Sequence, residues 1–171
     1  TGSTSDLAGS SIKASFIEST LNSGTGVTLT ATNDINVNEN ISWTDALFTL
    51  DATNDININA VMDASGTAGL TMNGNVLVGF NSGEASGFKG RVDLSIADII
   101  INGNTYKVLT SLGSEGSTTT TDLQGMNGNL SVNYVLGNNI DASATSTWNS
   151  DGSGGFYGFD PIGDSWNSEF D

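Results

Sequence analysis

The side chains in this sequence that are best placed to do chemistry are acidic residues that recur at nearly regular spacing. Asp34, Asp55 and Asp98 each open a short phrase of alternating aliphatic residues, and Asn75 holds the same place in another copy. Paired carboxylates can cleave glycosidic bonds when they flank the substrate. Aspartates at turns also accept backbone N–H bonds, and this structural role is the simpler interpretation. We therefore expect no catalytic residue and no enzyme.

Composition removes most other catalytic groups. The chain of 171 residues contains neither histidine nor cysteine, which excludes the usual base at neutral pH, thiolate nucleophiles and disulfides. Lys and Arg total 4 against 19 acidic residues, and the formal net charge is -15. Because so acidic a chain repels polyanions, we expect no nucleic-acid partner. We also expect no cofactor or metal. Calcium stays an open alternative, since it binds carboxylate oxygens, although no complete calcium-loop motif occurs.

Aromatic residues gather near the end of the sequence. The members best suited to stack on sugar rings, and so to contact a glycan, are Trp148, Tyr157 and Trp166. Aromatic residues in Gly-rich loops also fold back over the edge of a repeat structure, and this packing role has more weight. Both interpretations stay open at this point.

An internal repeat reveals the elements that position these residues. The stretch TATNDINVNEN at 30–40 returns as DATNDININAV at 51–61. Both stretches contain a five-residue kernel: an acid or amide, an aliphatic residue, any residue, an aliphatic residue, and then Asn or Gly. Kernels start at positions 34, 55, 75 and 98, and a fifth spans 129–133. A repeat of this length indicates a stacked solenoid.

The alternation within each kernel indicates which type of solenoid the repeat forms. Aliphatic residues alternate with asparagine, which is the period of a strand buried on one face, and no leucine-rich-repeat pattern is present. The sequence therefore predicts an all-β fold, a right-handed parallel β-helix (β-solenoid) with about 20–23 residues per coil. Two core ladders are expected, Ile35, Ile56, Val76 and Ile99 in one and Val37, Ile58, Val78 and Ile101 in the other. Asn38, Asn59 and Asn102 could add a ladder of stacked side-chain amides.

The pattern divides the chain into three parts. Residues 1–24 form a leading segment, either a short helix or an irregular first coil. Residues 25–149 form β-helix coils, with excursions near 80–92 and 111–123. Residues 150–171 form a Gly- and aromatic-rich incomplete coil, ordered or in part disordered.

Longer phrases carry a resemblance to a known family. The stretch IESTLNSGTGVTLTATNDINVNENISW at 17–43, the region 101–149 and GFDPIGDSW at 158–166 resemble the repeat region of filamentous haemagglutinin-like exoproteins (adhesins) of bacterial two-partner secretion systems. The resemblance covers most of the chain. It implies a fragment of a long parallel β-helix that is secreted to the bacterial cell surface. It also implies, for the full-length protein, the outer-membrane transporter of the secretion pair as a partner.

The function expected from pattern and resemblance is structural. We expect a rod segment of a cell-surface adhesin-like exoprotein, which holds distal binding or effector parts away from the cell and serves cell adhesion. Host or microbial surface glycans or proteins are the further partners that this role implies. The alternative is a carbohydrate-binding or polysaccharide-active β-helix domain, which would need exposed aromatic rows or convergent acids.

Overall fold

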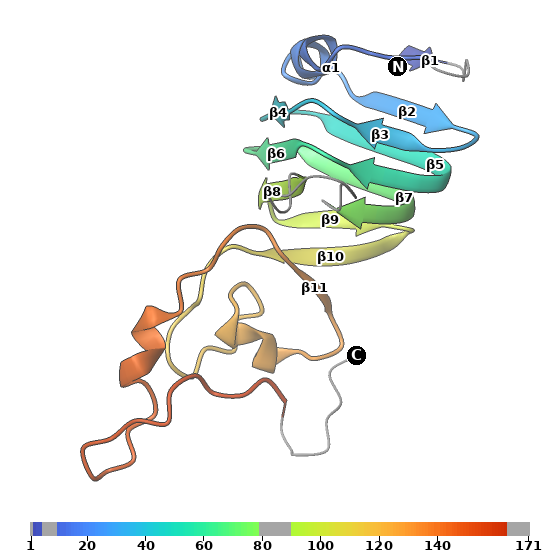
Figure 1. Ribbon diagram of the computed structural model, residues 1–171. Helices are drawn as coiled ribbons and strands as arrows, with labels where there is room; N and C mark the ends of the chain where they lie inside the picture. The colour runs from blue at the N-terminus through green and yellow to red at the C-terminus, as the bar shows by residue number, and fades with distance from the viewer. Residues whose placement is uncertain (1, 5–9, 79–89, 164–171) are drawn as a thin grey trace, which may run out of the picture. The chain divides into compact units, whose positions relative to one another are not determined.

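The computed structural model describes residues 2–4, 10–78 and 90–163 (Figure 1). The chain divides into two compact units, Thr1–Tyr106 and Lys107–Asp171. The regular structure is mostly β-sheet, and the strand pairs formed among β1 to β9 are parallel. The all-β prediction with parallel strands is therefore confirmed. Among the described residues, no helix has the length and apolar character needed to cross a membrane.

The first unit begins with a strand and a helix, and strands follow to its end. Its elements are β1 (Gly2–Thr4), α1 (Ala14–Leu21), β2 (Val27–Ala31), β3 (Ile35–Val37), β4 (Ile41–Trp43), β5 (Leu47–Ile58), β6 (Val61–Ser65), β7 (Gly69–Val78), β8 (Arg91–Ser95), β9 (Asp98–Ile101) and β10 (Asn104–Leu109), which runs on into the second unit.

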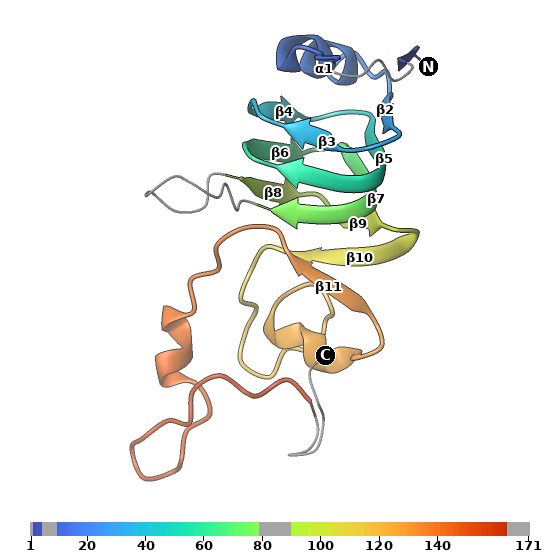
Figure 2. The same cartoon turned by 45° about the vertical axis from the view of Figure 1, so that its right-hand side comes forward.

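These strands form two sheets. The larger sheet has the order β1-β2-β5-β7-β9-β10, with β3 also paired to β5. The smaller sheet has the order β4-β6-β8. Figures 1 and 2 agree that β2, β5, β7 and β9 lie side by side, while β4, β6 and β8 form the other layer. The chain thus passes between the sheets as it advances, and equivalent strands of successive passes become neighbours.

The register of these pairs follows the sequence repeat. Strand β2 pairs with β5 through Leu29 and Leu50, which is the spacing of the first two kernels. The same spacing joins β3 to β5 through Ile35 and Ile56, and it joins β4 to β6. Because side chains alternate between the two faces of a strand, a constant spacing places like residues over like residues.

One irregularity keeps both halves of β5 and β7 in register. Asp51 pairs with Asn73 and Asp55 pairs with Asn75, so β5 has more residues than β7 between these two pairs. Gly74 crosses this point with φ +143, and a Cβ there would lie 3.0 Å from the carbonyl oxygen of Ala52. Only glycine fits this backbone position without strain.

The core lies between the two sheets. Phe48, Leu50, Ile56 and Ile58 alternate with more exposed residues along β5 and are fully buried. The Trp43 ring on β4 meets Phe48 edge to face, with 5.6 Å between the ring centroids. Aliphatic and aromatic side chains of successive passes therefore share one continuous interior.

The predicted ladders are correct for their first three members. Ile35, Ile56 and Val76 are in register, and Val37, Ile58 and Val78 are in register beside them. Val37 and Ile58 are buried, whereas Val78 is 43% exposed. The ladders are therefore best covered at the level of β5.

The fourth member of each ladder was predicted wrongly. Ile101 pairs with Met72, and Ile100 pairs with Thr71, so β9 lies beside the first half of β7. Ile99 is buried, but it does not stack on Val76, and Ile101 does not stack on Val78. The reason is that the chain has already returned to the smaller sheet through β8, which pairs with β6 at a longer spacing than that of the kernels. Strand β9 is therefore the first strand of the next coil, and it lies beside the first half of β7 rather than the second.

A tight turn follows β9. Asn102 and Gly103 both have positive φ, 50 and 77, and two such residues in a row form the turn that joins antiparallel strands. The asparagine predicted as a third ladder amide is therefore a turn residue.

Helix α1 covers one edge of the smaller sheet. The Ser42 N–H donates to the Glu18 Oε1 at 2.8 Å, and the Thr44 N–H donates to the Asn22 Oδ1 at 2.8 Å. The Asn22 Nδ2 also donates to the Ser42 carbonyl at 3.4 Å. Of the two structures expected for the leading segment, a short helix or an irregular first coil, the structure has the helix. Its polar side chains satisfy backbone groups that an open strand edge would expose.

Replacing Asn22 with alanine should lower the free energy of unfolding by about 1–2 kcal/mol, because the Thr44 N–H and the Ser42 carbonyl lose their partner. Urea denaturation followed by circular dichroism measures the change. The exposed Asn139 serves as a matched control, and its alanine variant should stay within about 0.5 kcal/mol of the parent. Equal stability of both variants would show that the side chain of Asn22 does not stabilise the β4 edge.

The second unit has a different architecture. From Lys107 onward its elements are the end of β10, the 3-10 helix η1 (Gln124–Gly128), β11 (Asn133–Leu136) and the 3-10 helix η2 (Ser143–Thr147). The Gly137 N–H donates to the Leu109 carbonyl at 2.9 Å. The coils predicted up to residue 149 do not continue regularly in this unit. The fifth kernel opens with a turn that the Asn129 Oδ1 closes by accepting the Ser131 N–H, so only its last residue is in a strand.

Of the two predicted excursions from the coils, only the second lies wholly within the described residues. Residues 80–89 lie outside the described residues, and Arg91 and Val92 belong to β8. Residues 111–123 contain no strand, as the prediction requires.

Candidate functional site

The recurring acids form a short column where β3 and the middle of β5 and β7 meet the outer surface. The Asp55 N–H donates to the Asp34 Oδ1 at 3.2 Å, and the Asn75 Nδ2 donates to the Asp55 Oδ1 at 2.9 Å. Asp98 is not part of this column, because it opens β9 beside the first half of β7. The carboxylates of the column accept N–H bonds, which is the structural role expected for them.

Side-chain amides form two ladders next to the acidic column. The Asn57 Nδ2 donates to the Asn36 Oδ1 at 3.1 Å, and the Asn59 Nδ2 donates to the Asn38 Oδ1 at 2.9 Å. The predicted ladder of Asn38 and Asn59 is confirmed for these two members. In both ladders the later residue, Asn57 or Asn59, donates to the earlier one, so both bonds run in the same direction.

Asn102 takes a different role from the predicted one. Its Oδ1 accepts the Gly74 N–H at 2.8 Å, and its Nδ2 donates to the Gly74 carbonyl at 3.1 Å. One side chain thereby satisfies both backbone groups of the glycine at the irregular point of β7.

The acidic column borders a shallow polar groove of about 810 Å³. Its lining residues are Asp34, Thr53, Asn54, Asp55, Gly74, Asn75 and Asn102. None of these described residues is basic, so the described lining places no cation beside the carboxylates of Asp34 and Asp55. Among the described residues, no group of three or more His, Cys, Asp or Glu side chains is placed to hold a metal ion.

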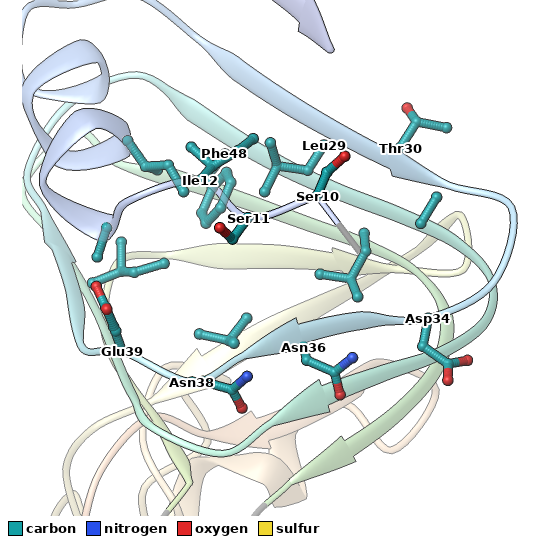
Figure 3. A pocket seen from close by; sticks show the side chains of 16 residues that line it. Ser10, Ser11, Ile12, Leu29, Thr30, Asp34, Asn36, Asn38, Glu39 and Phe48 are labelled. Carbon is teal, nitrogen blue, oxygen red and sulfur yellow. The ribbon is translucent and has the colours of Figure 1, made fainter. Parts of the chain in front are cut away.

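A second hollow, of about 730 Å³, lies at the level of β2, β3 and β4. Figure 3 shows Asp34, Asn36, Asn38 and Glu39 along one side of it, with Ser10–Ile12, Leu29 and Phe48 on the other. The remaining lining residues are Ala14, Ile17, Thr30, Ala31, Ile35, Val37 and Ile41. The described lining residues therefore give the hollow an apolar interior and an acidic rim.

Among the described aromatic residues of the second unit, Trp148 is buried, whereas Phe156 and Tyr157 are exposed. The Trp148 side chain is only 8% exposed and stacks on Phe159, with 6.4 Å between the ring centroids. Its assignment as a glycan contact is therefore wrong. The Tyr157 N–H donates to the Asn149 carbonyl and the Gly158 N–H donates to the Trp148 carbonyl, which folds the loop back over Trp148. Tyr157 is 79% exposed, and Trp166 lies outside the described residues.

No family model, no curated protein and no solved structure matches this chain. The site must therefore be interpreted from its own residues.

A pair of amide side chains that sequence reasoning missed holds the last described segment. The buried Gln124 donates from its Nε2 to the Asp160 carbonyl at 3.1 Å and accepts the Asp160 N–H at its Oε1. Asn127 donates to the Pro161 carbonyl and accepts the Gly163 N–H. These side chains bind backbone as a neighbouring strand would. Their close spacing on η1 is the only sequence signal, and it is not specific.

The Asp151 side chain closes the DGSGG loop by accepting backbone N–H bonds. Its Oδ1 accepts the Ser153 N–H at 2.7 Å and the Gly155 N–H at 2.9 Å. These bonds, the Ser153 bond first, favour the ionised form and lower the pKa of Asp151 below its ordinary value of 3.8.

The Asp151 carboxylate should therefore titrate below pH 3.8 in a 13C NMR titration. Because its folded-state pKa is depressed, its stabilisation of the loop is present above the unfolded pKa and is lost as the pH falls through the lowered pKa. In Asp151→Asn the Oδ1 acceptor remains but no proton is bound, so the loop amides of Ser153 and Gly155 should keep constant chemical shifts over the same range. A midpoint at or above pH 3.8 would contradict the assignment of these bonds.

Proposed function

We propose that this chain is a rod segment of a secreted, surface-displayed adhesin-like exoprotein, built as a right-handed parallel β-helix with about 20–23 residues per coil. The observation that carries the proposal is the shared register of successive passes. The pairs Leu29–Leu50 and Ile35–Ile56 keep one spacing, and Leu50–Met72 and Ile56–Val76 extend both columns to a third level. A repeat that stacks on itself in this way builds length rather than a closed site.

The physical basis of such a rod is nearest-neighbour stacking. Each pass contributes a β-ladder, an aliphatic column and side-chain amide bonds to the next pass. Because each level contacts only its neighbours, stability grows as levels are added, and the burial of apolar surface supplies most of it. The amide ladders lie on the outer face, so they add lateral rigidity without using core volume.

The same proposal assigns location and partners. The full-length protein would be secreted to the bacterial cell surface through the outer-membrane transporter of its secretion pair. Distal parts of the rod would contact host or microbial surface glycans or proteins. The high acidity of the chain supports a solvated, surface-exposed rod, since its formal charge of -15 opposes self-association.

Electron microscopy of cells that make the parent protein tests this role. An antibody against the exposed loop 151–154 should label a thin shaft between the cell body and the far end of the fibre. Cells that lack the parent gene provide the control. Label confined to the fibre tip or to the cell interior would contradict a rod segment.

The alternative, a carbohydrate-binding or polysaccharide-active domain, has narrower support. The exposed Tyr157 and the polar groove beside Asp34 and Asp55 favour it. A glycan array of the parent chain and of Tyr157→Ala, with product analysis on the bound glycans, tests it. Binding that is lost in Tyr157→Ala, or any glycan cleavage, would favour the alternative over the rod.

A further inference from the structure

The sequence contains three Asn-Gly pairs, the dipeptides most prone to spontaneous deamidation. They lie at 73–74, 102–103 and 127–128. In this reaction the backbone nitrogen of the glycine attacks the side-chain Cγ of the asparagine. Glycine favours the attack, because it has no Cβ to hinder the approach and its backbone turns freely. Whether each pair reacts therefore depends on what holds the glycine nitrogen and the asparagine amide.

Gly74 lies just beyond the end of the ladder between β7 and β9. Met72 pairs with Ile101, the last residue of β9, and the chain then enters its tight turn. The Asn102 side chain replaces the missing strand. Its Oδ1 accepts the Gly74 N–H at 2.8 Å, and its Nδ2 donates to the Gly74 carbonyl at 3.1 Å. One side chain therefore holds the backbone of Gly74 on both sides of its Cα.

These two bonds restrain the reacting groups of two Asn-Gly pairs. The Gly74 nitrogen would have to turn toward the Cγ of Asn73, and this rotation would break its bond to Asn102. The Cγ of Asn102 is the atom that the Gly103 nitrogen would attack, and the Oδ1 and Nδ2 attached to it are both bound to Gly74. A contact that must open first lowers the fraction of molecules that can react. The same contact thus protects the first two pairs.

A separate contact holds the third pair. The Asn127 Nδ2 donates to the Pro161 carbonyl at 3.2 Å, and the Asn127 Oδ1 accepts the Gly163 N–H at 2.7 Å. This contact uses no atom of Asn102. Asn127 is therefore an internal reference for any change that acts on Asn102.

We propose that Asn73 is a deamidation site that the Asn102 side chain protects in the folded chain. When the contact opens, the Gly74 nitrogen bonds to the Cγ of Asn73 and the Cγ–Nδ2 bond breaks. The proton of the Gly74 N–H leaves with the amide group as ammonia. Water then opens the five-membered succinimide ring at either carbonyl, which gives aspartate or isoaspartate at position 73.

Either product would weaken the ladder between β5 and β7. Asn73 is in register with Asp51, so an aspartate at position 73 would place like charges directly opposite each other, which is destabilising. Isoaspartate adds a backbone atom at the same point, which regular strand geometry does not accommodate. The contact of Asn102 with Gly74 thus preserves the stacking of successive coils.

Peptide mapping by tandem mass spectrometry, after incubation of the folded chain at mildly alkaline pH, tests the proposal. In Asn102→Ala, deamidation at Asn73 should be at least about tenfold faster than in the unaltered chain, because both bonds to Gly74 are lost. Deamidation at Asn127 should change by no more than about twofold in the same digests. In Asn102→Asp the Oδ1 that accepts the Gly74 N–H remains, so deamidation at Asn73 should be slower than in Asn102→Ala.

Two controls separate local protection from loss of the whole fold. Phe48→Ala leaves the bonds to Gly74 in place, although we expect it to lower the free energy of unfolding more than Asn102→Ala does. It should therefore accelerate deamidation at Asn73 less than Asn102→Ala does. If Phe48→Ala does not fold, as judged by circular dichroism, the milder Asn22→Ala replaces it. In concentrated urea all these chains should deamidate at Asn73 at one rate, because the residues next to it in sequence are the same.

Faster deamidation at Asn73 in Asn102→Ala, with Asn127 unchanged, would support the proposal. Equal rates at Asn73 in Asn102→Ala and in the unaltered chain would overturn it. A rate in Phe48→Ala that matches the rate in Asn102→Ala would also overturn it, since deamidation would then proceed through global unfolding. The same holds if the folded, unaltered chain deamidates at Asn73 as fast as it does in urea, because the contact would then give no protection.

Discussion

Replacing Phe48 with alanine should lower the free energy of unfolding by about 3–5 kcal/mol. Phe48 is fully buried and packs edge to face on Trp43. It is in register with Val27 on one side and Leu70 on the other. Because these neighbours belong to three successive passes that are tied by β-ladders, they cannot move together to fill the space that the ring leaves. Urea denaturation measures the loss, and hydrogen exchange in β5 should rise with it.

Phe16 provides a matched control on helix α1. Its side chain is 64% exposed, so Phe16→Ala removes the same atoms from a site that is already in contact with water. The expected change is within about 0.5 kcal/mol. A Phe48→Ala loss that is no larger than the Phe16→Ala loss would mean that the two sheets do not enclose a packed core.

The register of the first three coils could be predicted because the sequence repeat is nearly exact. The spacing of the kernels that start at positions 34, 55 and 75 appears again in the strand pairs Ile35–Ile56 and Ile56–Val76. The alternation of side chains along a strand then fixes which residues face the core, since a shift by one position would expose the whole aliphatic column. Asn36 and Asn57 follow on the outer face for the same reason.

The smaller sheet was missed because its columns do not repeat residue types. Trp43 lies over Ala64, and Ala64 lies over Leu94. Packing requires only that volumes of neighbouring levels fit together, so a large residue can stand over a small one. Sequence comparison searches for like residues and does not find such a column.

The candidate site was predicted less well than the fold. The roles of Asp34 and Asp55 as acceptors of N–H bonds could be inferred, because a turn after alternating residues needs such groups. The burial of Trp148 depends on a loop that folds back through backbone bonds of Asn149. A local sequence pattern does not encode such a contact.

The fourth kernel shows that a sequence repeat does not always form an equivalent structural repeat. Ile99, Ile100 and Ile101 have the composition of a kernel, yet the next two residues are Asn102 and Gly103. Asn-Gly is the strongest short signal for a tight hairpin turn. Given more weight, this pair predicts a reversal of the chain at the point where the structure has it.

Replacing Asn102 with alanine should therefore cost about 2–3 kcal/mol, the second-largest effect expected for a single substitution in this chain. Two bonds to Gly74 are lost, and alanine must adopt the positive φ of 50 that asparagine tolerates. Asn102→Gly relieves the backbone conformation but not the lost bonds, so it should cost only about 1–2 kcal/mol.

The difference between these two variants isolates the strain of the turn from the bonds to Gly74. Asn104→Ala, just beyond the turn, should change stability by no more than about 0.5 kcal/mol in the same urea series, because the bond from its Nδ2 to the Asn102 carbonyl is long, at 3.5 Å. If Asn102→Gly is as stable as the parent, the bonds to Gly74 contribute nothing, and the turn geometry alone ends the parallel passes. If Asn102→Ala is as stable as the parent, the reversal of the chain does not depend on this residue at all.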